Sequence, residues 1–325
     1  MFQCLPLKLN SNKAESMKLH VIYTVILIFF VGILSVKAQE FIPLWPKRKM
    51  PDSKGLKLTD SMSNERVYRV AIPGMYAFFP SKDDNCGAAV VIYPGGGYTH
   101  LAMNLGGFQL AKWFNTIGMS AFVVEYRLPN SPDLVERELG PLQDAERALQ
   151  IVRANAEKWN IRKDKIGVLG TSAGGHLAAL MGTTKDNVTT LKDSIGELSF
   201  HPDFMILVSP VIDMGKYAHK GSRESFLGMN PSQEMITKYS PKNNVDAQTP
   251  PCFIADAFND KVVQPINSLL FYQALLDHNI STSFHVFPQG GHAINVNNNP
   301  GSTSLWKKLC EEWLKEMDFI SFDKK

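Results

Sequence analysis

The stretch Gly170-Thr171-Ser172-Ala173-Gly174 follows the apolar run Lys165–Leu169 and opens a run of small and apolar residues, Ala173–Met181. This order predicts a strand, a sharp turn and a helix, which is the setting that gives a G-x-S-x-G motif its meaning. The flanking glycines permit the turn, and the turn holds the Ser172 hydroxyl above the end of a sheet. A lone match is weak, because serine is also a common first residue of helices. Ser172 is therefore a candidate nucleophile whose support must come from the rest of the chain.

A glycine cluster upstream follows a second predicted strand. Ala88–Tyr93 is a continuous apolar run, typical of a strand buried on both faces, and Pro94-Gly95-Gly96-Gly97-Tyr98 comes directly after it. Glycines leave their backbone N–H groups uncovered by side chains, which suits an oxyanion hole. The same residues would also suit an ordinary flexible turn.

Two further strand ends carry acidic and imidazole side chains. The apolar run Pro251–Ala255 is followed by Asp256 and then Asp260, and either carboxylate could orient a catalytic base. Ser283–Phe287 alternates like a short strand and leads to His292 on a glycine-rich loop. The order serine, aspartate, histidine along the chain is the one that α/β-hydrolases use.

These residues carry a family resemblance that covers most of the chain from about residue 66 onward. The chain resembles α/β-hydrolase esterases of the hormone-sensitive-lipase-like group, and more closely the secreted bacterial carbohydrate acetylesterases of the acetyl xylan esterase type. The matching stretches are Ala89–Tyr98, Tyr126–Pro129, Pro141–Ala145, Ile166–Ala178, Thr249–Pro251, Asp260–Val263 with Asn267-Ser268, and Gly290–His292.

The resemblance implies a role for each matching residue. It makes Ser172 the nucleophile, Asp260 the acid of the triad and His292 the base. It also implies an oxyanion hole built from the backbone N–H groups of Gly96, Gly97 and Ala173. Two departures from the family pattern stand out: Pro94 replaces the histidine that precedes the three glycines in the wider lipase-like group, and Asp256 replaces a frequent histidine. The second departure leaves open whether Asp256 contributes to the triad.

Several nearby residues have both a structural and a functional interpretation. Tyr98 and His100 follow the glycine cluster and are candidate substrate contacts. His176 lies one helical turn after Ser172 and is expected to be a packed side chain rather than a second base. Arg127 is expected to anchor a strand end through a buried salt bridge, with Asp144 and Arg147 completing the network.

The N-terminal region predicts export. Lys18 precedes the uncharged apolar stretch Val21–Val36, and Val36-Lys37-Ala38 suits cleavage before Gln39. We therefore expect residues 1–38 to be a signal peptide, with Met17 as an alternative start, and the protein to be secreted or periplasmic. The stretch is shorter than a typical membrane span, so stable membrane association after cleavage is not expected, although a retained anchor is the alternative.

The remainder of the chain fits one catalytic domain. Residues 39–65 are expected to form an N-terminal arm, and 66–325 an α/β-hydrolase domain whose mostly parallel sheet carries helices on both faces. A hairpin over residues 65–79, turning at Pro73-Gly74, is expected to begin it. The segment Asp213–Val245 is rich in Gly, Ser, Asn and Lys, and is expected to form loops and short helices over the active-site edge.

Composition excludes several other functions. A net charge of +3 over 325 residues gives no reason to expect nucleic acid as a partner. The histidines and acids show no metal-ligand spacing, so no metal and no cofactor are expected. Outside the leader, Cys86, Cys252 and Cys310 form no disulfide framework, and their pairing stays open, as does the oligomeric state.

The predicted function is that of a serine esterase. The expected substrates are small-molecule or polysaccharide esters, with acetyl esters of plant-type polysaccharide or oligosaccharide suggested by the resemblance alone. The alternatives are a general short-chain carboxylesterase and a serine peptidase of the prolyl-oligopeptidase type. A non-catalytic binding protein on the same scaffold is a further alternative.

Overall fold

The computed structural model describes residues 1, 39–47, 49–189, 191–292 and 294–321. Contacts divide the chain into two units, Met1–Glu40 and Phe41–Lys325, and the architecture described below is that of the second. The predicted signal peptide lies, apart from Met1, outside the described residues. Within the described ranges, no helix combines the length and the apolar character needed to cross a membrane.

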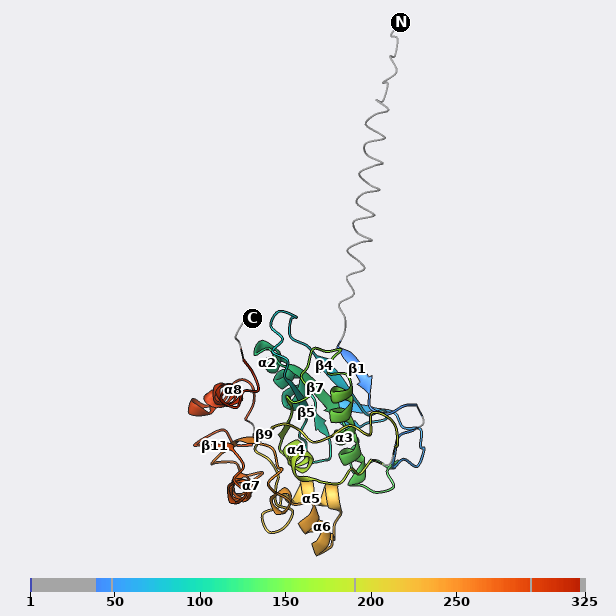
Figure 1. Ribbon diagram of the computed structural model, residues 1–325. Helices are drawn as coiled ribbons and strands as arrows, with labels where there is room; N and C mark the ends of the chain where they lie inside the picture. The colour runs from blue at the N-terminus through green and yellow to red at the C-terminus, as the bar shows by residue number, and fades with distance from the viewer. Residues whose placement is uncertain (2–38, 48, 190, 293, 322–325) are drawn as a thin grey trace. The chain divides into compact units, whose positions relative to one another are not determined.

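An eight-stranded sheet forms the centre of the structure, in the order β1-β4-β7-β5-β8-β9-β10-β11 (Figure 1). Neighbouring strands from β7 to β11 are parallel, whereas β4 runs antiparallel to β7. The strands are β1 (Glu40–Pro43), β4 (Gly74–Phe78), β5 (Ala89–Tyr93), β7 (Ser120–Glu125), β8 (Ile166–Thr171), β9 (Met205–Val208), β10 (Cys252–Ala257) and β11 (Thr282–Phe287). The α/β-hydrolase fold predicted from the sequence is confirmed.

Helices cover both faces of this sheet, as the alternation of side chains along β7 shows. The Phe122 ring packs 5.0 Å from that of Trp159, just beyond α3, whereas the next residue, Val123, faces Gly107 in front of α2. The longer helices are α2 (Gln109–Thr116), α3 (Leu139–Ala154), α4 (Ala173–Thr183), α7 (Ile266–Asp277) and α8 (Trp306–Glu316). The expected short helices in 213–245 are α5 (Lys220–Leu227), α6 (Gln233–Lys238) and the 3₁₀ turn η2 (Pro241–Asn243). Two more short segments are the π-helix η1 (Asn104–Phe108) and the 3₁₀ turn η3 (Gly301–Leu305).

The register aligns the strand ends that carry the candidate site. Tyr93 of β5 pairs with Gly170 of β8, and Val208 of β9 pairs with both Thr171 and Ala255. Because these strands are parallel, the loops that follow them leave from the same edge of the sheet. The polar loops after β5, β8, β10 and β11 are therefore neighbours.

The predicted hairpin over residues 65–79 is wrong. β3 (Arg66–Arg69) pairs with β2 (Ser61–Ser63) and β6 (Leu101–Ala102) in a separate antiparallel sheet, whereas β4 belongs to the main sheet. Val67 lies opposite Leu101 and Met75 lies opposite Val124. The two strands therefore bury their apolar residues against different partners, and Pro73-Gly74 carries the chain from one sheet to the other.

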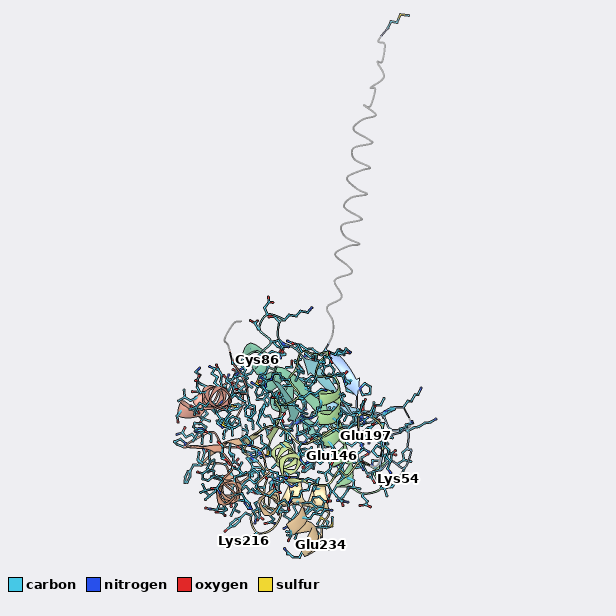
Figure 2. The ribbon with its side chains drawn as sticks, in the orientation of Figure 1. Lys54, Cys86, Glu146, Glu197, Lys216 and Glu234 are labelled. Carbon is cyan, nitrogen blue, oxygen red and sulfur yellow. The ribbon has the colours of Figure 1, made fainter. Side chains whose placement is uncertain are left out.

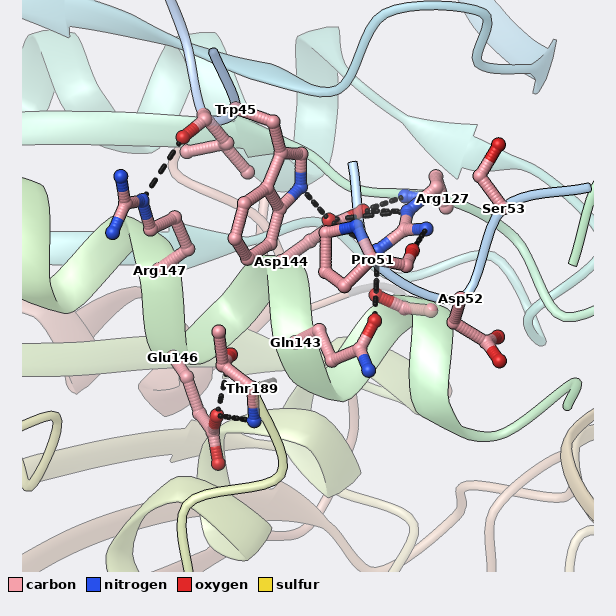
Figure 3. A network of polar contacts seen from close by, with 12 residues as sticks. Trp45, Pro51, Asp52, Ser53, Arg127, Gln143, Asp144, Glu146, Arg147 and Thr189 are labelled. Carbon is pink, nitrogen blue, oxygen red and sulfur yellow. Dashed lines mark hydrogen bonds and ion pairs between the residues drawn. The ribbon is translucent and has the colours of Figure 1, made fainter. Parts of the chain in front are cut away.

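A buried polar network ties the N-terminal arm to the sheet (Figure 3). The Arg127 guanidinium forms a salt bridge with Asp144 at 2.9 Å, and both side chains are buried. Trp45 Nε1 donates to the same carboxylate at 2.7 Å, and Arg127 Nη1 donates to the Pro51 carbonyl at 2.7 Å. The expected buried salt bridge of Arg127 is thus present. Arg147 contacts the network through Trp45, over whose ring its guanidinium lies, but its ion pair is with Asp193 and not with Asp144.

A second buried carboxylate, Glu146, holds the loop that follows α4. It accepts hydrogen bonds from the backbone N–H groups of Val188 and Thr189 and from the Thr189 hydroxyl. Figure 2 shows Glu146 among packed side chains, whereas Lys216 and Glu234 lie at the periphery. Burial raises the pKa of Glu146 to about 7, and the hydrogen bonds from Val188 and Thr189 oppose this shift only in part.

Candidate active site

Ser172, His292 and Asp260 form a continuous chain of hydrogen bonds. Ser172 Oγ lies 2.8 Å from His292 Nε2, and His292 Nδ1 lies 2.7 Å from Asp260 Oδ2. A carboxylate oxygen can only accept, so Nδ1 carries the imidazole proton and Nε2 is left to accept from the serine hydroxyl. The three residues come from the loops after β8, β11 and β10, and the arrangement can activate a hydroxyl for attack on a carbonyl.

The turn at Ser172 needs its glycines. Ser172 has φ 55° and ψ −120°, a backbone conformation that non-glycine residues rarely adopt. A Cβ on Gly170 would lie 2.0 Å from the Gly174 carbonyl oxygen, and a Cβ on Gly174 would lie 2.0 Å from that of Tyr93. The Ser172 N–H also donates to the Val208 carbonyl at 3.0 Å. Close packing against β5 and β9 therefore fixes the half-buried Ser172 at the carboxyl edge of the sheet.

The two carboxylates after β10 have different surroundings. Asp260 accepts hydrogen bonds through Oδ1 from the backbone N–H groups of Val262 and Val263, which leaves Oδ2 for His292. Asp256 is fully buried at the end of β10 and accepts from the Ser268 hydroxyl of α7 at 2.6 Å. Burial raises the pKa of Asp256 to about 6. Of the two candidates, Asp260 is therefore the one in contact with the imidazole.

The glycine loop after β5 lies beside Ser172. Gly96 and Gly97 have φ of 138° and 62°, and a Cβ on Gly96 would lie 2.0 Å from the His100 carbonyl oxygen. Among the described residues, the N–H groups of Gly96 and Gly97 donate to no acceptor, and both residues line the cavity that contains Ser172. Ala173 begins α4 directly after Ser172. The loop can therefore donate to a developing oxyanion.

The candidate substrate contacts lie in different places. His100 lines the catalytic cavity, and burial followed by the charge of Arg66 lowers its pKa, which favours a neutral ring. The Tyr98 side chain is fully buried, and its hydroxyl lies 2.7 Å from His176 Nδ1. The expectation that Tyr98 contacts substrate therefore does not agree with its position. His176 is fully buried as well, as expected for a packed side chain.

The catalytic cavity has a volume of about 450 Å³ and includes residues that the sequence did not single out. His219 lies within the segment Asp213–Val245, and in the structure it is the N-cap of α5, where its side chain accepts from the Ser222 N–H. No local sequence signal singled it out. The other residues of the lining that were not anticipated include Arg66, Leu105, Ser209, Val262, Ile294 and Asn295. A further cavity of about 570 Å³ under the N-terminal arm contains none of the triad residues.

The cysteines and potential metal ligands lie apart from this chemistry. Cys86, Cys252 and Cys310 are free thiols, and burial raises the pKa of each. In the part of the chain that the structure describes, no three His, Cys, Asp or Glu residues are placed to hold a metal ion.

The sheet topology and the arrangement of Ser172, His292 and Asp260 define the class: the protein has the fold of an α/β hydrolase. The BD-FAE family model matches residues 75–275, so the chain belongs to the BD-FAE family. The resemblance to hormone-sensitive-lipase-like and acetyl xylan esterase-like proteins is thereby confirmed.

Two curated relatives have xylan-related names. The chain is 35% identical to endo-1,4-beta-xylanase B of Butyrivibrio fibrisolvens, over 77% of this chain and 39% of that protein. It is 32% identical to the acetylxylan esterase of Xylanibacter ruminicola, over 75% of this chain and 46% of that protein. The chain thus spans less than half the length of these curated relatives.

Solved structures agree with this relationship. An acetyl ester-xyloside bifunctional hydrolase from Caldicellulosiruptor lactoaceticus superimposes with a TM-score of 0.75 at 34% identity, covering 89% of this chain and 100% of that one. The carboxylesterase Cest-2923 from Lactobacillus plantarum shares the fold, with a TM-score of 0.62 at 22% identity over 82% of this chain and 100% of that one.

Proposed function

We propose that the chain removes acetyl groups from carbohydrate esters by an acyl-serine mechanism. The hydrogen-bonded chain Ser172–His292–Asp260 in a cavity beside the glycine loop carries the proposal. The acetyl and xylan parts rest on the relatives named acetylxylan esterase and acetyl ester-xyloside hydrolase. A plant-type polysaccharide or its oligosaccharides is the proposed source of the substrate.

The proposed reaction has two stages. The Ser172 hydroxyl attacks the ester carbonyl while His292 Nε2 takes its proton, and Asp260 stabilises the imidazolium that forms. The oxyanion of the tetrahedral intermediate accepts from the N–H groups of Gly96, Gly97 and Ala173, each worth about 3–4 kcal/mol in the transition state. His292 then protonates the leaving alcohol, and a water molecule releases acetate from the acyl-serine by the same steps.

The test is hydrolysis of 4-nitrophenyl esters of increasing acyl length by the protein and by its Ser172→Ala variant. We expect preference for acetate and a loss of at least about 10³-fold in kcat in the variant, with unchanged unfolding behaviour. Acetate release from acetylated xylan then tests the carbohydrate. Preference for long acyl chains would instead indicate a lipase-like carboxylesterase, and cleavage of aminoacyl amides alone a peptidase.

We also propose that the protein is exported, to the periplasm or the medium, with removal of residues 1–38. Lys18, the apolar stretch Val21–Val36 and the small residue Ala38 support this proposal. N-terminal sequencing of the exported protein should begin at Gln39. Intact protein that retains the apolar stretch and sediments with membranes would indicate an anchor instead.

A further inference from the structure

A second cavity adjoins the catalytic one. It has a volume of about 530 Å³ and shares Gly97, Thr99 and His219 with the catalytic cavity. The catalytic cavity alone exceeds what an acetyl group requires, so the adjoining space is available for the other half of an ester. Because Gly97 belongs to the proposed oxyanion loop, that space begins next to the reacting carbonyl.

His219 lies at the boundary of the two cavities in a defined protonation state. The Ser222 N–H donates to His219 Nδ1, so the proton of the neutral ring is on Nε2. Burial, followed by the nearby His292, lowers the pKa of His219 and favours that neutral ring. A Cβ on Gly97 would lie 3.9 Å from His219 Cε1, which places the ring edge against the oxyanion loop. His219 Nε2–H is thus a neutral donor close to the ester.

The rest of the second cavity mixes donors and acceptors. Arg137 donates from Nη1 to the Glu224 carbonyl at 3.2 Å, and its other described hydrogen bond also uses Nη1, so Nε and Nη2 remain as donors. The Glu224 carboxylate and the Asn130 amide supply acceptors in the same lining. Charges of both signs disfavour a ligand with one strong charge, whereas alternating donors and acceptors suit the hydroxyl groups of a neutral sugar.

We propose that this second cavity is a subsite for the sugar unit that bears, or adjoins, the esterified hydroxyl. His219 Nε2–H donates to a sugar oxygen beside the ester, and Asn130 and Arg137 bind hydroxyl groups further along the chain. The proposal rests on the proposed acetylesterase function and adds to it a preference for oligomeric over simple esters. The ligand class is a neutral oligosaccharide of pentose or hexose units.

The kinetic test compares kcat/KM for acetylated xylotriose with kcat/KM for 4-nitrophenyl acetate, which has no sugar. We expect Asn130→Ala and Arg137→Ala each to lower the ratio of these two values at least about fivefold, mainly through KM for the oligosaccharide. The matched control is Lys112→Ala, which removes an exposed cation of α2 that lines neither cavity. Its ratio should equal that of the unmodified protein.

A binding test separates the subsite from catalysis. Titration of the Ser172→Ala protein with deacetylated xylotriose should shift the imidazole resonances of His219, and Arg137→Ala in the same background should weaken that binding at least about fivefold. An unshifted His219, or selectivity ratios equal to those of the unmodified protein in both variants, would overturn the subsite. If the unmodified protein hydrolyses neither ester yet xylotriose still binds at His219, the proposed function fails while the sugar site stands.

Discussion

The Tyr98 hydroxyl donates a 2.7 Å hydrogen bond to His176 Nδ1, joining the loop after β5 to α4, which begins directly after Ser172. The direction of the bond follows from the other ring nitrogen. His176 Nε2 lies 2.8 Å from the Tyr239 carbonyl, which can only accept, so Nε2 carries the proton and Nδ1 accepts. Burial lowers the pKa of His176 to about 4, so this arrangement persists at neutral pH.

Tyr98→Phe should therefore reduce catalysis as well as stability. Tyr98 directly follows Gly97, and loss of the bond frees the loop whose N–H groups are proposed to bind the oxyanion. We expect kcat for 4-nitrophenyl acetate to fall about tenfold with little change in KM. We also expect the free energy of unfolding to fall by about 1–3 kcal/mol, because His176 Nδ1 is left buried without a donor. Urea unfolding and steady-state kinetics measure the two effects.

Tyr93→Phe is the control for that experiment. Its hydroxyl is equally buried and donates to the Ala145 carbonyl of α3 at 3.1 Å, away from the glycine loop. This variant should lose stability while keeping kcat. An equal fall of kcat in both variants would show that the effect on catalysis comes from stability alone.

The two carboxylates after β10 should differ strongly in their importance. Asp260→Asn places an amide opposite His292 Nδ1 and can hold the imidazole in the wrong tautomer, so we expect kcat to fall by about 10³–10⁴. Asp256→Asn keeps an acceptor for the Ser268 hydroxyl and makes no contact with the imidazole, so its kcat should fall less than about tenfold. Comparable losses in the two variants would contradict the assignment of Asp260 as the acid.

Glu146 should make stability depend on pH. Its pKa is raised from 4.5 to about 7 in the folded protein, so the folded state binds the proton more tightly than the unfolded state does. Its contribution to stability is therefore complete below pH 4.5 and declines as the pH rises through 7, by about 3 kcal/mol in all. Glu146→Gln removes this titration but keeps an acceptor for Thr189.

The measurement is urea unfolding of both proteins between pH 4.5 and 8. All other titrating groups are common to the two proteins, so the difference between the curves reports Glu146. We expect the unmodified protein to lose stability relative to Glu146→Gln as the pH rises. Parallel curves would show that protonation of Glu146 does not cause the pH dependence of the unfolding free energy.

Removal of Arg127 alone from its salt bridge with Asp144 should destabilise the protein strongly. Arg127→Leu leaves the Asp144 carboxylate buried with Trp45 Nε1 as its remaining side-chain donor. We expect the free energy of unfolding to fall by about 3–5 kcal/mol. Arg162→Leu breaks an exposed pair with Asp164 and should change stability far less. Thermal or urea unfolding of the two variants side by side tests the difference.

Much of the fold follows from local signals. Continuous apolar runs mark strands buried on both faces, and parallel strands bring the loops at their carboxyl ends to one edge. Ser172, Asp260 and His292 could therefore be placed near one another from the sequence. The choice between Asp256 and Asp260 could not, because both follow the same apolar run. It depends on Asp256 remaining within β10 and turning toward Ser268 of α7, whereas Asp260 lies beyond the strand.

The features that the sequence did not predict correctly depend on contacts between distant parts of the chain. β3 and β4 lie close together in sequence on either side of Pro73-Gly74, and nothing local indicates that Val67 lies opposite Leu101 instead of pairing with β4. Tyr98 is polar and follows a catalytic-type loop, yet its neighbours Phe226 and His176 come from later helices and cover its ring. His219 lies in an irregular segment that reaches the site through tertiary packing.

The anchoring of the arm by Trp45 has a consequence for synthesis of the protein. Its hydrogen-bond partner Asp144 lies 99 residues further along the chain. At about 5–20 residues per second, a ribosome adds that partner roughly 5–20 s after Trp45. The indole cannot form this bond during that interval, so the N-terminal arm completes its packing only after α3 has been synthesised.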